Sequence, residues 1–313
     1  MVVILTGMGN MDRAGSRRVW IGNAPVSFGV FEMTPDDAVL PDPEDLLLAI
    51  SASGYEGVDL GPVGYLGGVG QIGERLISQG LSLTGGWLQF DFLHEEHFAQ
   101  QLSALPATLD IFCAASAAAD RAGNGRPAPH PTLAEGGGRT GGSDRLGASQ
   151  WSLVAKGVSE VAQRCRERGL EPTFHHHMGT CIETPNEIDE LLERTDVGLC
   201  LDTGHLLLGG GDPVEGLRRW SRRVNHVHIK DASLAVVEQV RREQLPMIEL
   251  WRRHGFVPLG AGNMDVDGFL SELRSSDYRG WMVVEEDHLP PLHVIWETAG
   301  QARNRLFLEQ RGF

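Results

Sequence analysis

Short runs rich in β-branched and other apolar residues alternate with longer stretches of helical character from Val19 onward. The eight predicted strands are Val19–Asn23, Gly57–Leu60, Ser82–Trp87, Leu109–Ala114, Glu171–His175, Gly198–Asp202, His226–Lys230 and Trp281–Glu285. A helix candidate follows every strand but the last. This alternation is typical of a parallel sheet with crossover helices, and eight repeats favour closure as a (β/α)8 barrel.

Proline and acidic residues mark several predicted helix starts. Pro43, Pro185 and Pro213 are each followed by a Glu within two residues, as helix N-termini prefer. No G-x-G-x-x-G motif follows a predicted strand, so the pattern disfavours a doubly wound dinucleotide-binding fold.

Two segments interrupt the alternation. Residues 122–147 are dense in Gly, Pro, Arg and small polar residues and have no apolar period. We expect a flexible loop there, either a lid or a tolerated insertion, which contributes no ligands and can be deleted without loss of folding. Residues 234–254 are expected to form a helix over the same face. Residues 1–18 are expected to be a loose leader, and residues 19–313 a single barrel.

Composition narrows the class of protein. A formal net charge of −15 over 313 residues would repel a phosphate backbone or an anionic membrane, so we expect neither nucleic acid nor a membrane as a partner. The N-terminus does not resemble a signal peptide. Four cysteines form no C-x-x-C pair, which favours a reducing compartment, and the cytoplasm is the expected location. The sequence is compatible with a homo-oligomer.

Residues able to bind a metal or transfer a proton occur at the ends of the last four predicted strands. Imidazoles or carboxylates occur at His175-His176-His177, Asp202-Thr203-Gly204-His205, His226-Val227-His228-Ile229-Lys230 and Glu285-Glu286-Asp287. The C-terminal ends of barrel strands are where such enzymes place their catalytic residues. We expect Glu286 and Asp287 to include a solvated charge.

Strand alternation predicts which of these residues converge, because residues two apart share a face. His175 and His177 share one face of their strand, and His226, His228 and Lys230 share one face of theirs. With Asp202 and Glu285 they form a mixed nitrogen and oxygen set that could hold a divalent ion, with manganese or cobalt favoured and zinc or iron as alternatives. Either His175 or His177 could be the ligand of its strand.

These segments resemble the xylose-isomerase-like TIM barrel superfamily of sugar isomerases, epimerases and endonuclease-IV-type proteins, and within it most closely the myo-inosose-2 dehydratases. The resemblance is carried by segments spread over nearly the whole barrel: residues 22–32, 54–62, 64–66, 175–180, 201–205, 226–231 and 280–285. The Asp-Thr-Gly-His and His-Val-His-x-Lys-Asp pieces are common across the superfamily. The His-His-Met-Gly-Thr and Gly-Tyr-Leu pieces are more specific to the dehydratases.

The resemblance implies a ligand set and a reaction. In the sugar epimerases of the superfamily the metal is held by Glu, Asp, His and Glu. Asp202, His228 and Glu285 match the last three, but His175 stands at the place of the first Glu. Because an epimerase needs a base on each face of its substrate, this departure favours elimination of water from a cyclic polyol ketone of the 2-keto-myo-inositol type, as in inositol catabolism.

Each residue then has an expected role. Glu285 is the first choice of base and His177 the second, while His205 assists the departing hydroxyl. Lys230 either holds a substrate hydroxyl or the developing enolate, or forms a salt bridge to Asp231 or a neighbouring strand. Glu32 and Trp87 are candidate substrate contacts, as are His177 and Lys230.

Other functions stay open beside this one. The nearest is a sugar isomerase or epimerase, or a keto-glycoside lyase, on the same scaffold. A DNA-repair endonuclease would need a basic groove, which the charge does not supply. A barrel that only binds its ligand would leave four adjacent strand ends with ligand-type residues unexplained.

Overall fold

The computed structural model describes residues 19–32, 34, 38–136, 145–246, 248–290 and 294–313. Its strands are β1 Val19–Asn23, β2 Gly57–Val58, β3 Ser82–Leu83, β4 Gly85–Phe90, β5 His130–Glu135, β6 Thr173–His175, β7 Gly198–Asp202, β8 Val224–Ile229, β9 Asp231–Ala232, β10 Phe256–Val257 and β11 Gly280–Val284. The expected leader, residues 1–18, lies outside the described residues.

Nine of these strands form one parallel sheet that curls into a barrel. They are hydrogen-bonded in the order β3-β2-β1-β11-β8-β7-β6-β5-β4. Only Thr84 separates β3 from β4, so the two act as one bent strand, and Leu60 N donates to Gly85 O at 3.0 Å. This bond brings the two ends of the sheet together, and the expected (β/α)8 TIM barrel is confirmed.

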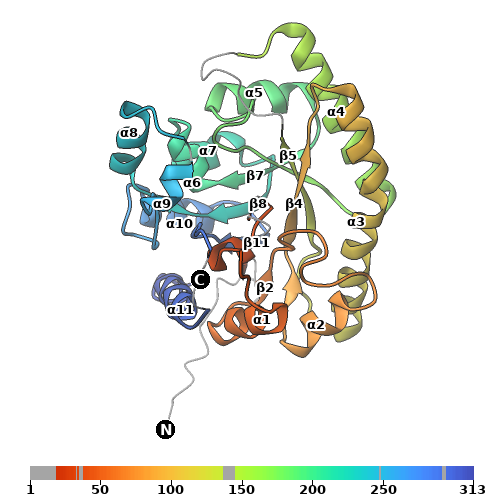
Figure 1. Ribbon diagram of the computed structural model, residues 1–313, viewed down its shortest axis with the longest axis vertical. Coiled ribbons are helices and arrows are strands. Elements are labelled where there is room, and N and C mark those ends of the chain that lie inside the picture. The colour runs from red at the N-terminus through yellow and green to blue at the C-terminus, as the bar shows by residue number, and fades with distance from the viewer. Residues whose placement is uncertain (1–18, 33, 35–37, 137–144, 247, 291–293) are drawn as a thin grey trace.

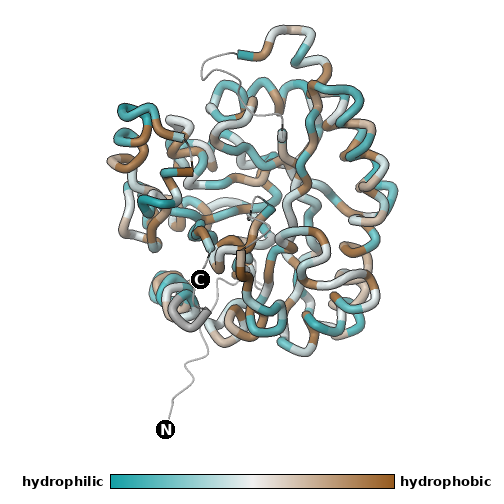
Figure 2. Tube along the Cα trace, in the orientation of Figure 1, coloured by the Kyte–Doolittle hydropathy of each residue, from teal (hydrophilic) through white to brown (hydrophobic). Residues whose placement is uncertain are grey.

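Helices surround the strands (Figure 1). They are η1 Pro25–Phe28, α1 Pro43–Ala52, α2 Ile72–Ser78, α3 Glu95–Ala122, α4 Ala148–Glu167, α5 Pro185–Arg194, α6 Thr203–Leu208, α7 Pro213–Trp220, α8 Leu234–Arg242, α9 Ile248–Arg252, α10 Val266–Ser275 and α11 Val294–Glu309. Hydrophobic and hydrophilic stretches alternate along them (Figure 2), as expected for helices with one face on the barrel.

The three expected helix starts are confirmed, and polar caps stabilise each of them. Asp42 and Asp212 accept hydrogen bonds from backbone amides in the first turns of α1 and α7. Thr184 and Glu187 form a reciprocal capping box at the start of α5. The proline at the first position of each helix loses no intrahelical bond, because that amide has no partner in a helix.

The predicted strand Leu109–Ala114 is wrong, because these residues lie inside α3. Leu102, Leu105 and Leu109 are buried on one side of this helix, at the spacing of successive helical turns. By length and composition α3 could also cross a membrane, with a mean hydropathy of 1.5 in its most apolar window. In this fold it packs against α2 and β3.

The prediction of a flexible segment at residues 122–147 is wrong in its central part. His130–Glu135 forms β5, which pairs with β4 along its whole length and with β6. Deleting the segment would remove this barrel strand, so the structure argues against the expectation that folding survives the deletion. Residues 137–144 lie outside the described residues. The expected helix over residues 234–254 is two helices, α8 and α9.

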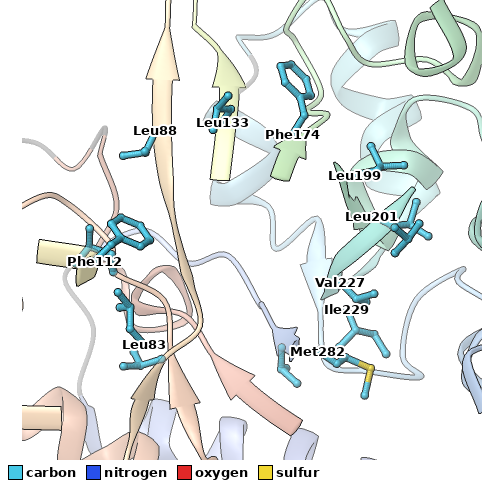
Figure 3. Packing of buried hydrophobic residues seen from close by; sticks show 14 of the residues in the cluster. Leu83, Leu88, Phe112, Leu133, Phe174, Leu199, Leu201, Val227, Ile229 and Met282 are labelled. Atoms are coloured by element: carbon cyan, nitrogen blue, oxygen red, sulfur yellow. The ribbon is translucent and has the colours of Figure 1, made fainter. Parts of the chain in front are cut away.

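The main hydrophobic core lies between the barrel and its helices. Leu133, Phe174 and Leu201 project from their strands into it (Figure 3), and all three are fully buried. Polar residues at alternate positions therefore point into the barrel. A smaller apolar cluster of Trp281, Ala24 and Val283 packs separately from this core.

Candidate functional site

Four consecutive strands of the barrel bring one imidazole or carboxylate each to a single point. His175 ends β6, Asp202 ends β7, His228 lies near the end of β8, and Glu285 follows β11. One ligand atom from each lies within 4.8 Å of those of the other three. All four side chains are buried, so the site is inside the barrel mouth and not on its surface.

Four atoms of these residues are buried without a hydrogen-bond partner in the described structure: His175 Nδ1, Asp202 Oδ2 and both ring nitrogens of His228. Of these, Asp202 Oδ2 and His228 Nδ1 face the cluster and lie 3.9 Å apart. Asp202 Oδ2 is also 3.4 Å from His175 Nε2, and His228 Nδ1 is 3.2 Å from Glu285 Oε1. Buried polar atoms without partners are costly, and this set of two imidazoles and two carboxylates fits a divalent metal ion.

The local fold explains why these atoms converge. Asp202 ends β7 and caps α6, and its Oδ1 accepts a hydrogen bond from His205 N at 2.8 Å. Its Oδ2 is thereby left facing the cluster. Burial lowers the pKa of His175, which keeps the imidazole neutral and its lone pair available. His177 is not part of the four-residue cluster, so the geometry selects His175 as the histidine of its strand.

Lys230 is held between three carboxylates. Its Nζ lies 2.8 Å from Glu285 Oε2, 2.9 Å from Asp287 Oδ1 and 3.5 Å from Asp202 Oδ2. Burial opposes its charge, but these three neighbours raise the pKa of Lys230 well above its ordinary value. Of the two roles left open for Lys230, the structure shows the salt bridge to a neighbouring strand.

Burial and the charge of Lys230 shift the pKa values of Glu285 and Asp287 in opposite directions. Burial opposes ionisation of Glu285, but His228 and Lys230 hold its pKa well below the usual range. Burial raises the pKa of Asp287 to about 6, against the effect of Lys230. The expectation of a solvated charge at Glu286 and Asp287 is wrong, because both are buried.

The rings of His177 and His205 lie in contact beside Lys230, with centroids 3.8 Å apart and planes tilted by 42°. His177 Nδ1 lies 2.8 Å from Met178 O. Because a carbonyl only accepts, Nδ1 carries the proton and the lone pair is on Nε2. His205 Nε2 lies 3.1 Å from Lys230 Nζ and accepts from it by the same argument. Burial lowers the pKa of His177 to about 3 and that of His205 well below its ordinary value.

A pocket of about 440 Å³ opens onto the cluster, within the size range of small-molecule sites. Eight of the nine predicted site residues line it: Glu32, Trp87, His175, His177, His205, His228, Lys230 and Glu285. Asp202 is fully buried beside them. Glu32 lines the rim of the pocket and is exposed to solvent.

Comparison with known proteins agrees with this geometry. The family model of the xylose isomerase-like TIM barrel matches residues 47–303. The chain belongs to this family.

Relatives within and around the family carry several functions. The inosose dehydratase of Geobacillus kaustophilus (strain HTA426) is 40% identical over 162 residues, which are 51% of this chain and 53% of that protein. The chain thus spans about half the length of the curated relatives it matches. The IOLI protein with a bound zinc atom superposes with a TM-score of 0.69 at 14% identity, covering 94% of this chain and 99% of that one.

An L-ribulose 3-epimerase is also similar, with a TM-score of 0.67 at 15% identity over 93% of this chain and 94% of that one. At such identities these two structures establish the xylose isomerase-like fold alone. Reaction and substrate therefore have to be argued from the site.

Three acidic pocket residues were missed as site residues in the sequence. Asp287 lies two residues after Glu285 and Asp59 follows the short strand β2, so the rule of polar residues at strand ends could have found both. Glu135 ends β5 and accepts a hydrogen bond from Cys181 N at 3.2 Å. It was hidden because the sequence around β5 was interpreted as a loop.

Proposed function

We propose that this chain is a metal-dependent hydro-lyase that removes water from a cyclic polyol ketone of the 2-keto-myo-inositol type by β-elimination. The observation that carries the proposal is the buried His175, Asp202, His228 and Glu285 cluster at the base of a small-molecule pocket. The inosose dehydratase relatives, at 34–40% identity over about half of the chain, support the choice of reaction.

The four clustered residues would hold manganese or cobalt, with zinc or iron as alternatives. A divalent ion there would polarise the substrate ketone and acidify the adjacent C–H. Glu285 is the first candidate to accept that proton, because it lines the pocket and Lys230 fixes its orientation at 2.8 Å. His177 is the second candidate, because its Nε2 lone pair is not used by Met178.

Elimination also requires a proton for the departing hydroxyl. The His205–Lys230 pair is suited to supply it, because the two side chains are in contact and both line the pocket. The C–H proton passes to the base, the C–O bond at the β-carbon breaks, and hydroxide leaves as water with the proton from this pair. The net products are an unsaturated ketone, which tautomerises to a dione, and one water.

Trp87 and Glu32 complete the proposed substrate site. The Trp87 ring lies edge-on to His175 and His177, with centroids 5.3 and 5.2 Å away. Its remaining surface faces the pocket, where a ring C–H face of a polyol can pack on it. Glu32 is placed to bind substrate hydroxyl groups. In this proposal the enzyme acts in the cytoplasm on a small molecule.

The second candidate is a sugar isomerase or epimerase, or a keto-glycoside lyase, and the epimerase among the similar structures favours it. The imidazole at His175 counts against an epimerase, since an imidazole that ligates a metal has no lone pair left for base chemistry. The formal net charge of −15 disfavours nucleic acid as the class of substrate.

The test is an elemental analysis of the purified chain, followed by an assay on 2-keto-myo-inositol with manganese or cobalt added. We expect one divalent ion per chain and a product that absorbs in the ultraviolet. Running the same reaction in heavy water separates the candidates, because an epimerase exchanges a substrate proton without releasing water. Exchange without a dione would contradict the dehydratase proposal.

A further inference from the structure

The two ring nitrogens of His228 face carboxylates on opposite sides. His228 Nδ1 points to the cluster, 3.2 Å from Glu285 Oε1. His228 Nε2 points away from it, and the nearest carboxylate oxygen is Asp59 Oδ2 at 3.4 Å. Nε2 is buried, and no hydrogen bond to it is formed in the described part of the chain.

Asp59 is itself fixed by its neighbours. Its backbone amide donates to Asn23 O at 3.0 Å, which continues the pairing of β1 with β2. Thr84, between β3 and β4, donates its hydroxyl to Asp59 Oδ1. Because Oδ1 is occupied and the residue is only 6% exposed, Oδ2 is left for His228.

Metal ligation through one imidazole nitrogen determines what the other must do. If His228 Nδ1 holds a cation, the only ring proton is on Nε2, and that proton needs an acceptor in this buried site. A carboxylate in this position fixes the tautomer and the ring orientation and makes the imidazole a better donor to the metal.

We propose that Asp59 is a positioning residue for the metal site: it accepts the Nε2 proton of His228, while Thr84 holds the Asp59 carboxylate in place. The inference rests on the proposed metal-dependent function. It extends the site to the N-terminal half of the barrel, because Asp59 and Thr84 come from segments that supply none of the four clustered residues.

A competing arrangement uses the same residues differently. Asp59, His226 and His228 also offer ligand atoms within 4.8 Å of one another, and both ring nitrogens of the fully buried His226 lack hydrogen-bond partners. A second cation there would require His228 to give up both ring protons to bridge two ions. Positioning by Asp59 needs only the ordinary neutral imidazole, so we favour it, and stoichiometry distinguishes the two.

The test is a titration of the chelator-treated full chain with Co²⁺, following the visible absorption of the bound ion. We expect one equivalent to bind to the wild type, and Asp59→Asn to bind one equivalent 10- to 100-fold more weakly, as is typical for loss of such a partner. Asp59→Glu should recover part of the affinity. Asp120→Asn removes one carboxylate from the exposed side of α3, outside the pocket, and should change the affinity less than threefold.

Each other result has a definite meaning. Wild-type affinity in Asp59→Asn would overturn the inference and leave the proposed function standing. Two equivalents in the wild type, with one lost in both Asp59→Asn and His226→Ala, would overturn it in favour of a second ion. No Co²⁺ binding by the wild type would overturn both proposals. If Asp59→Asn does not fold, Thr84→Val is the second variant, and unchanged affinity there would also count against the inference.

Discussion

Lys230 Nζ and Glu285 Oε2 lie 2.8 Å apart inside the barrel, where both side chains are at most one-tenth exposed. The pair joins β8 to the end of β11, next to the metal-type cluster. Because both charges are buried, removing one of them leaves the other unpaired and destabilises the folded chain.

We expect Lys230→Met to lower the free energy of unfolding of the metal-free chain by about 3–5 kcal/mol, since it leaves Glu285 and Asp287 without their buried cation. Urea denaturation measures this. Arg218→Met is the matched control: Arg218 pairs with Glu272 at the same distance of 2.8 Å, but 62% of its side chain is exposed. That change should cost at most about 1 kcal/mol. Equal effects would show that burial does not govern the pair.

Glu285→Gln should lower the dehydration rate by roughly 10²–10⁴-fold even at saturating metal, because the amide cannot accept the substrate proton. Dione absorbance measures the rate, and metal titration ensures saturation. His177→Gln should have the smaller effect. If Glu285→Gln keeps full activity and His177→Gln loses it, the base is His177.

His175→Glu tests why the reaction is an elimination. A glutamate restores the carboxylate found in the epimerases that the sequence resembles, so the variant should still bind metal and should exchange more substrate proton for deuterium without forming more dione. Mass spectrometry of the recovered ketone measures the exchange. If the variant exchanges no more deuterium than the wild type, the imidazole of His175 is not the feature that separates elimination from epimerisation.

Gly57→Ala should destabilise the barrel interior. An added Cβ at Gly57 would lie 2.7 and 2.9 Å from ring atoms of Trp281, whereas one at Gly68 meets nothing within 4 Å. Since Trp281 is fully buried, it has little room to move, and overpacking of this kind costs about 1–3 kcal/mol. Chemical denaturation of Gly57→Ala beside Gly68→Ala checks this, and equal stabilities would contradict the expected clash.

The sequence was informative where a polar residue ends an apolar run. His175, Asp202, His228 and Glu285 could be grouped in advance because parallel strands carry their C-terminal ends to one edge, and alternation assigns the face. Periodicity does not determine how far each side chain lies from the others. His177 contacts His205 and lies outside the cluster because β6 ends at His175.

The sequence misled us at β5, and the reason is that this strand depends on distant partners. His130–Glu135 contains a proline and few β-branched residues, and its order comes from pairing with β4, about 45 residues earlier in the chain, and with β6. The segment 109–114 has residues that suit a strand, but the helical spacing of Leu102, Leu105 and Leu109 continues through it. The helical spacing of the leucines therefore predicted this segment better than its strand-like composition did.

All four clustered residues come from positions 175 to 285. The first half of the chain supplies another part of the pocket wall, which includes Val26, Phe31, Glu32, Trp87, Gln89, Thr132 and Glu135. Apart from Asp59 and Thr84, the first half of the chain can therefore vary the shape of the pocket without touching the clustered residues. A library confined to those wall positions would test whether the choice of ligand can be changed while the cluster of His175, Asp202, His228 and Glu285 is kept.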